Sequence, residues 1–82
     1  MSKPRALITG ITGMDGSHLA DLLLEKGYQV YGLMRRHSHA DPWRIRHILN
    51  QIELHTGDLL DQAGLANLLS LIQPHEVYNL AA

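Results

Sequence analysis

The chain has 82 residues, a formal net charge of −1 and no cysteine. The absence of cysteine excludes a disulfide framework and thiolate chemistry, and the near-zero net charge argues against a general nucleic-acid binder. No apolar run approaches the roughly 20 residues that span a membrane, and the first five residues lack the core of a signal peptide. We therefore expect a small cytoplasmic protein that binds neither nucleic acid nor a membrane.

The first part of the chain is predicted to form a strand, a glycine-rich turn and a helix. Residues 6–9 are an unbroken apolar run, typical of a parallel strand covered on both faces. A leucine-rich helix is expected over 17–26, with Gly27 at its C-terminal cap. Between them lies the sequence Gly10-Ile11-Thr12-Gly13-Met14-Asp15-Gly16. This order is typical of the phosphate-binding corner of a dinucleotide fold, the alternative being an ordinary glycine turn.

Each glycine of this turn has a predicted role. Gly10 lets the chain leave the strand in a tight turn, and Gly13 lacks the side chain that would block a pyrophosphate. Gly16 lets the helix pack close to the sheet, so that the free N–H groups at the helix start face the phosphates. The other candidate contacts in the turn are the Thr12 hydroxyl, the Met14 backbone N–H and Asp15.

A second strand is expected over 28–34, followed by a loop over 35–40. Asp41 then provides a helix N-cap, and Pro42 suits the first turn of a short helix. The apolar face of that helix would consist of Ile45, Ile48 and Leu49.

Two more strands and one helix complete the predicted elements. Residues 52–56 alternate between apolar and polar, which indicates a half-exposed strand near a sheet edge. Asp61 is expected to cap a helix that Pro74 ends, and a last strand covers 77–82. The predicted apolar face of this helix is Leu65, Leu68, Leu69 and Ile72.

This alternation of strands and helices predicts the α/β class. With right-handed crossovers, it gives a Rossmann-type doubly wound parallel sheet of strand order 3-2-1-4. That sheet is incomplete, because it contains one mononucleotide-binding half and a single strand beyond the switch point. We therefore expect residues 1–82 to be the N-terminal part of a cofactor-binding domain, with the substrate-binding part absent and the outer edge of the fourth strand bare.

The residues after the second strand favour NADP over NAD. An NAD site usually has an acidic residue at this place, whereas here Arg35 and Arg36 follow Met34. Two guanidinium groups suit a 2′-phosphate through charge-assisted hydrogen bonds. The alternative is a solvated arginine pair at a strand end.

Other candidate cofactor contacts lie at the ends of the third and fourth strands. Asp58 is placed to accept a hydrogen bond from the adenine amino group, with the Leu59 backbone beside it; alternatively, Asp58 only caps the turn. The small or apolar residues that end the fourth strand would let the backbone approach the cofactor, although strand packing explains them as well. These residues are Leu80, Ala81 and Ala82.

No catalytic or metal-binding group is expected in this chain. Tyr28, Tyr31 and Tyr78 all lack a lysine four positions later, and no Ser-His-Asp arrangement is evident. Six histidines are present, including the pair His37 and His39, but none combines helical spacing with a third ligand. They are better interpreted as solvated surface residues.

These residues together resemble the N-terminus of extended short-chain dehydrogenase/reductases, and within them the GDP-mannose 4,6-dehydratase family. The resemblance is carried by residues 6–13, 15–17, 22–28 and the Arg35-Arg36 pair. It continues through Arg44-Ile45, His55, Gly57-Asp58-Leu59 and residues 77–81. Two departures are Met14, where the family often has glutamine, and the loop over 37–41, which differs from the usual serine-rich run.

The resemblance implies a lyase that uses NADP as an internal redox shuttle to convert GDP-mannose to GDP-4-dehydro-6-deoxy-mannose, in a complete enzyme that is a homo-oligomer. It also implies that the catalytic Ser/Thr, Glu, Tyr and Lys lie beyond the matched stretch. Two alternatives stay open: another nucleotide-sugar epimerase or reductase of the superfamily, and a stand-alone module that binds a nucleotide or a partner chain.

Overall fold

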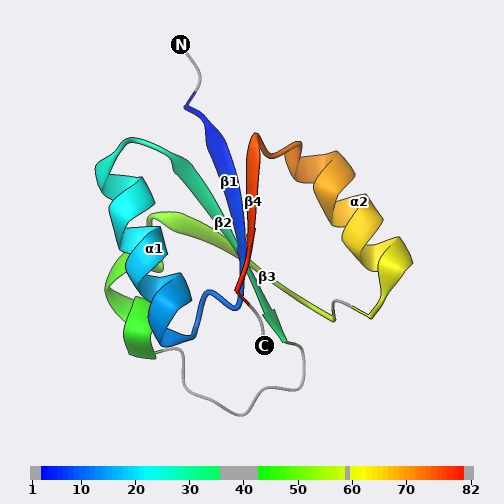
Figure 1. Ribbon diagram of the computed structural model, residues 1–82, viewed down its shortest axis with the longest axis horizontal. Coiled ribbons are helices and arrows are strands. Elements are labelled where there is room, and N and C mark those ends of the chain that lie inside the picture. Colours follow the sequence, from blue (N-terminus) through cyan, green and yellow to red (C-terminus); the bar gives the residue numbers. More distant parts are fainter. Residues whose placement is uncertain (1–2, 36–42, 59, 81–82) are drawn as a thin grey trace.

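A computed structural model describes residues 3–35, 43–58 and 60–80 (Figure 1). Four strands form one parallel sheet of order β3-β2-β1-β4, which confirms the predicted topology. The elements in chain order are β1 (Arg5–Thr9), α1 (Met14–Glu25), β2 (Gln29–Arg35), the 3₁₀ helix η1 (Trp43–Ile48), β3 (Ile52–Gly57), α2 (Gln62–Ile72) and β4 (Glu76–Asn79).

The sheet is covered by α1 and η1 on one face and by α2 on the other (Figure 1). Because β1 lies between β2 and β4, its residues Ala6, Leu7 and Ile8 are fully buried, as the unbroken apolar run predicts. Leu7 packs on the α2 side, while Ala6 and Ile8 pack on the α1 side. No helix in the described ranges is long and apolar enough to cross a membrane.

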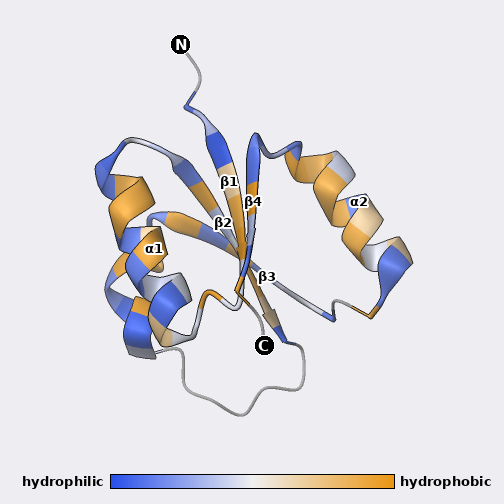
Figure 2. Cartoon of the chain, in the orientation of Figure 1, coloured by the Kyte–Doolittle hydropathy of each residue, from blue (hydrophilic) through white to orange (hydrophobic). Residues whose placement is uncertain are grey.

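The two faces of the sheet are buried unequally. Eight buried residues form the cluster under α1 and η1, whereas only Leu7, Leu33 and Ile72 form the cluster under α2. Figure 2 shows that α2 is apolar along most of its length, yet Ile72 is its one buried residue. The predicted apolar face of α2 does pack toward the sheet, but Leu65, Leu68 and Leu69 on that face are only half-buried.

Helix α1 begins three residues earlier than predicted. Its N-cap is Gly13, so Gly16, the last glycine of the motif, lies inside the first helical turn. Gly27 follows the C-cap residue Lys26 with a φ of 88°, a left-handed conformation that suits glycine at a helix end. The glycine-rich segment is therefore half turn and half helix.

The prediction for the short helix after β2 is partly wrong. Ile45 and Ile48 are buried, but Leu49 lies outside the helix and is 40% exposed. A 3₁₀ helix has three residues per turn, so i and i+3 share a face whereas i+4 does not. The predicted N-cap Asp41 and Pro42 lie outside the described residues.

The remaining boundaries differ by a few residues. Arg35, predicted to begin a loop, is the last residue of β2, and β3 extends to Gly57. β4 is shorter than predicted and starts at Glu76. The predicted cap of α2 is confirmed, because Asp61 Oδ1 accepts a hydrogen bond from the Gly64 N–H at 3.1 Å.

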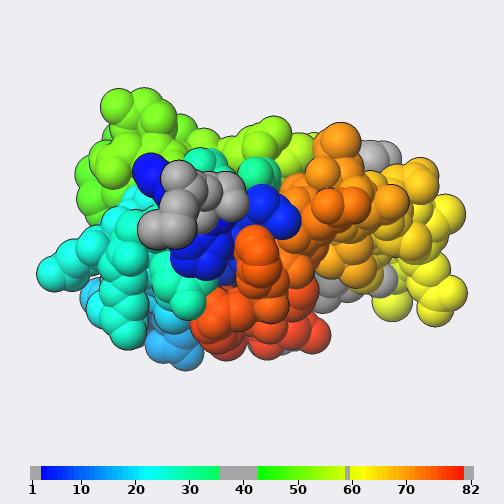
Figure 3. Space-filling view, turned by 90° about the horizontal axis from the view of Figure 1, so that it is seen from above, coloured from blue at the N-terminus to red at the C-terminus, as the bar shows by residue number. Residues whose placement is uncertain are grey.

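The amino-terminal edge of the sheet is closed by local hydrogen bonds. His75 Nδ1 accepts from the Arg5 N–H at 2.9 Å, and the Arg5 side chain donates to the Gln73 carbonyl at 3.0 Å. In Figure 3, which views this end, the start of β1 lies between the end of α1 and the segment that enters β4. The glycine turn and the ends of β2 and β3 lie at the opposite edge.

Candidate functional site

The glycine turn is a compact loop that carries the chain from β1 into α1. Gly10 has a φ of 74°, a conformation that other residues rarely adopt, and its N–H donates to the Leu33 carbonyl of β2 at 3.3 Å. The Gly13 N–H then donates to the Gly10 carbonyl at 3.0 Å, which closes the turn. The tight turn predicted at Gly10 is thus present.

Gly16 is required by the turn itself. A Cβ at this position would overlap the Gly10 carbonyl oxygen and would lie 2.8 Å from Ile11 Cα. These are backbone atoms, which cannot move aside by changing a rotamer. Gly16 therefore permits a close approach between the first turn of α1 and the Gly10-Ile11 backbone. The sequence analysis had instead predicted a close approach between the helix and the sheet.

Ile11 anchors the turn to the sheet, a role that the sequence analysis missed. Its side chain is fully buried and lies over Gly32 of β2, where a Cβ would be 2.6 Å from Ile11 Cδ1. The signal was an isolated glycine inside a strand, which marks a close approach. Ile11 and Gly32 together fix the height of the turn above the end of the sheet.

The first turn of α1 presents free backbone N–H groups. Gly13 has no side chain to cap them, and the Ser17 hydroxyl donates instead to the Met14 carbonyl at 2.9 Å. The N–H groups of Met14, Asp15 and Gly16 have no intrahelical acceptor by helix geometry. They can hold an anion, although the Asp15 carboxylate in the same turn offsets part of the attraction. Thr12, in the turn before them, is half-buried.

The carboxyl end of β2 carries a cation beside β3. Arg35 is exposed and pairs in register with Gly57, so the guanidinium group lies at the edge where β2 and β3 end. Arg36 lies outside the described residues, as do His37 and His39. At the start of η1, the Arg44 guanidinium stacks on the exposed Trp43 ring, 4.5 Å from its centroid.

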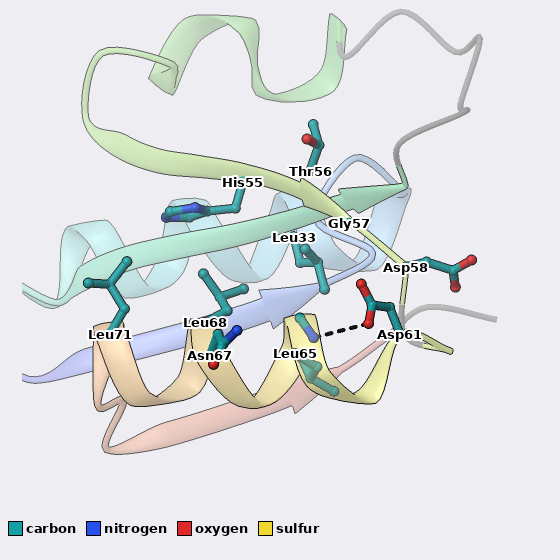
Figure 4. Close-up of a pocket in the computed structure, with 11 residues that line it drawn as sticks. Leu33, His55, Thr56, Gly57, Asp58, Asp61, Leu65, Asn67, Leu68 and Leu71 are labelled. Carbon is teal, nitrogen blue, oxygen red and sulfur yellow. Dashed lines mark hydrogen bonds between the residues drawn. The ribbon is translucent and has the colours of Figure 1, made fainter.

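A cavity of about 310 Å³ lies between the ends of β2 and β3 and helix α2 (Figure 4). Apolar side chains of β2 and α2 and polar groups of β3 and of the segment that leads into α2 surround it. The lining residues are Leu33, His55, Thr56, Gly57, Asp58, Asp61, Gly64, Leu65, Asn67, Leu68 and Leu71.

Asp58, the predicted adenine contact, lines this cavity and also stabilises the local turn. Its Oδ1 accepts from the Leu60 N–H at 2.9 Å, and its carbonyl accepts from the Asp61 N–H at 3.0 Å. One oxygen of the Asp58 carboxylate therefore caps the turn, as the alternative interpretation predicted. Leu59 lies outside the described residues.

The ends of β1 and β4 are joined beside the glycine turn. The buried Thr9 hydroxyl donates to Asn79 Oδ1 at 2.7 Å, and the Leu80 N–H donates to the Thr9 carbonyl at 3.1 Å. The Thr9–Asn79 pair was not predicted, because neither residue signals a partner 70 positions away. These bonds place Leu80 next to the turn, whereas Ala81 and Ala82 lie outside the described residues.

The structure thus collects the start of α1, Arg35, the cavity and Leu80 at the carboxyl edge of one parallel sheet, where open α/β sheets bind ligands. Within 3–35, 43–58 and 60–80, no three His, Cys, Asp or Glu side chains converge in a way that could hold a metal ion.

Comparison with known sequences gives the family. The family profile described as GDP-mannose 4,6 dehydratase matches residues 7–82 of this chain. The chain belongs to the GDP-mannose 4,6-dehydratase family. Among similar relatives, the GDP-mannose 4,6-dehydratase of Vibrio cholerae is 49% identical and matches 100% of this chain. The human and Arabidopsis thaliana enzymes are 48% and 52% identical, over 100% and 98% of this chain.

The chain matches only about a quarter of the length of these relatives. The chain spans 24% of the Vibrio cholerae enzyme and 25% of the human enzyme. Among solved structures, the Bordetella bronchiseptica enzyme WbmH in complex with NAD⁺ superposes with a TM-score of 0.83 and 31% identity, over 99% of this chain and 27% of that one. UDP-glucose 4-epimerase of Thermotoga maritima, solved with UDP-glucose, has a TM-score of 0.80 and 28% identity, over 95% and 24%.

Proposed function

We propose that this chain is the NADP-binding N-terminal part of a nucleotide-sugar dehydratase that converts GDP-mannose to GDP-4-dehydro-6-deoxy-mannose. The observation that carries the proposal is the match of residues 7–82 to the dehydratase family. The glycine turn supports it, because the N-cap residue Gly13 makes no side-chain cap hydrogen bond and so leaves the N–H groups at the start of α1 to an anion. The complex of WbmH with NAD⁺ supports a nicotinamide dinucleotide on this fold.

Four groups of residues would hold the cofactor. The pyrophosphate would lie on Gly10, Thr12 and Gly13 and on the N–H groups of Met14, Asp15 and Gly16. Arg35 and Arg36 would bind the 2′-phosphate, and this pair is the reason for proposing NADP rather than NAD. Asp58 and Leu59 would contact the adenine base, and the backbone of Leu80, Ala81 and Ala82 would lie beside the phosphates and ribose.

The described residues fit a dinucleotide at this edge. Gly13 is the N-cap of α1, and a side chain there would occupy the space beside the first helical turn, because its Cβ would have only the Gly10 carbonyl oxygen as a neighbour, at 3.4 Å. When bound, NADP would supply hydride transfer within a reaction that has no net redox change. The residues of this chain bind and orient the cofactor, and we assign none of the catalytic acid and base groups to residues 1–82. We further propose a cytoplasmic lyase that is a homo-oligomer when complete.

A second candidate is a nucleotide-sugar epimerase of the same fold. It is favoured by the similarity to UDP-glucose 4-epimerase, which covers 95% of this chain. Both candidates need the same cofactor corner, so they differ in products rather than in the described residues. Incubating the protein at its full length with GDP-mannose separates them, because a dehydratase product is lighter by one water whereas an epimerase product has unchanged mass.

Cofactor choice is tested by comparing NADPH with NADH. Trp43 is the only tryptophan of this chain, is exposed, and is close in sequence to the arginine pair, so its fluorescence can report binding. We expect NADPH to bind more tightly, and the double variant Arg35→Ala/Arg36→Ala to lose most of the difference. Each charge-assisted contact contributes roughly 1.5–3 kcal/mol, or about tenfold or more in affinity. The control Lys26→Ala removes a cation at the other end of α1 and should keep the preference; equal affinities in the unmodified protein would contradict the assignment.

A further inference from the structure

The first helical residue of α1 carries an exposed thioether. Met14 follows the N-cap Gly13 at the carboxyl edge of the sheet (Figure 1), and its side chain is 61% exposed. Ile11, in the same turn, is fully buried. The other methionine in the described part of the chain, Met34, lies half-buried in β2. Packing of the fold therefore does not explain an apolar, sulfur-containing side chain at position 14.

Helix geometry directs the Met14 side chain toward the open end of α1. Each Cα–Cβ bond of an α-helix tilts toward the amino terminus, so a side chain covers the turn that precedes it. For the first residue of α1 this surface is the helix end itself, where the N–H groups of Met14, Asp15 and Gly16 lack intrahelical acceptors. The Ser17 hydroxyl leaves them free, because it donates to the Met14 carbonyl at 2.9 Å. The thioether is thus beside the groups proposed to bind the pyrophosphate.

An exposed thioether reacts with peroxides to give a sulfoxide. The sulfur lone pair attacks one oxygen of hydrogen peroxide, the O–O bond breaks and an S–O bond forms. The proton of the attacked oxygen passes to the departing hydroxide, which leaves as water. Sulfur loses two electrons, and the peroxide gains them. The apolar side chain thereby becomes polar, with a partial negative charge on its new oxygen, and methionine sulfoxide reductases reverse the change.

We propose that Met14 is a reversible oxidation site that controls binding of the dinucleotide. The sulfoxide oxygen would lie beside the anionic oxygens of the pyrophosphate and repel them, in addition to the repulsion from the Asp15 carboxylate in the same turn. This inference rests on the proposed function, because it requires the phosphates to lie at the start of α1. Since the coupling is reciprocal, bound cofactor also protects the sulfur from peroxide.

Peroxide treatment of the full-length protein tests the proposal with two measurements. Mass spectrometry of the peptide that contains Met14 gives the fraction that has gained one oxygen. The dissociation constant of NADPH is measured before and after treatment, and the ratio is compared between variants. Met14→Leu removes the sulfur with little change of side-chain volume. Met34→Leu is the matched control, because it removes the half-buried methionine of β2 and keeps Met14.

We expect oxidation to weaken NADPH binding by about tenfold in the unmodified protein, equivalent to the loss of one charge-assisted hydrogen bond. Treatment with methionine sulfoxide reductase and a dithiol should restore the affinity. Met14→Leu should have the same dissociation constant before and after peroxide, whereas Met34→Leu should show the tenfold loss. Saturating NADPH during treatment should slow the oxidation of Met14.

The inference is overturned if peroxide does not modify Met14, or if the oxidised protein binds NADPH as tightly as the untreated one. A tenfold loss in Met14→Leu would assign the effect to another residue and would also overturn it. Failure of the untreated protein to bind NADPH would instead refute the proposed function, which makes the two failures distinguishable.

Discussion

Substituting Gly16 by alanine is the sharpest test of the phosphate corner. The new Cβ would lie 2.8 Å from Ile11 Cα and 2.9 Å from the Gly10 carbonyl carbon, and would overlap the Gly10 oxygen. Favourable carbon–carbon contacts need about 3.5–4.0 Å. The start of α1 must therefore move away from the turn by about 1 Å, and with it the N–H groups proposed to bind the pyrophosphate.

Two opposing effects set the expected stability change. Overpacking at a rigid site costs about 1–3 kcal/mol, whereas alanine in place of glycine in a helix contributes up to about 1 kcal/mol. We expect the free energy of unfolding to fall by about 1–2 kcal/mol, measured by urea denaturation of the full-length protein. NADPH affinity should fall at least tenfold, because a shift of about 1 Å breaks charge-assisted hydrogen bonds worth roughly 1.5–3 kcal/mol each.

Gly13→Ala is the matched control for this argument. The nearest atom to a Cβ at Gly13 is the Gly10 carbonyl oxygen at 3.4 Å, an ordinary contact. Its stability should stay within about 1 kcal/mol of the unmodified protein, while the methyl group at the phosphate position weakens NADPH binding. The reasoning is refuted if Gly16→Ala leaves both the unfolding free energy and the affinity unchanged.

Two further predictions concern stability. Thr9→Val removes the 2.7 Å hydrogen bond to Asn79 and should lower the free energy of unfolding by about 1 kcal/mol in urea denaturation; an unchanged midpoint would show that the pair does not hold β1 to β4. A hydrogen bond to Glu76 raises the pKa of Tyr28, and burial, together with Glu76, raises the pKa of Tyr78. The neutral phenols are thus favoured in the fold. This stabilisation is complete below the ordinary pKa near 10 and is lost as the pH rises through the raised values. Changing both tyrosines to phenylalanine should therefore flatten the decline of stability above about pH 10, and an equally steep decline would refute this explanation.

The sheet order was predictable because it depends on few local rules. Right-handed crossovers, the apolar run at 6–9 and the alternating pattern at 52–56 suffice to give the order β3-β2-β1-β4. The ends of strands were less predictable where a contact with a residue distant in sequence fixes the end. Glu76 begins β4 although its charge gives no strand signal, since Tyr28 and Tyr78 both donate to its Oε1 at 3.2 Å.

The positions of Gly10, in a tight turn after β1, and of Arg35, at the end of β2, were predictable because glycine and charge mark them in the sequence. The support beneath the candidate site was only partly predictable: the isolated Gly32 inside a strand signals a close approach, but nothing in the sequence identifies Ile11 as the residue that lies over it.

The unequal burial of the two sheet faces has a consequence for motion. α2 is fixed by Ile72 at one end and by the Asp61 cap at the other, while the side chains between them are half-buried or exposed. Helices with few buried contacts open at low free energy, so amide hydrogens of α2 should exchange with solvent faster than those of α1. Since α2 forms one wall of the cavity, a ligand bound there would slow exchange mainly in this helix. Local opening of α2 would then limit how fast such a ligand enters and leaves.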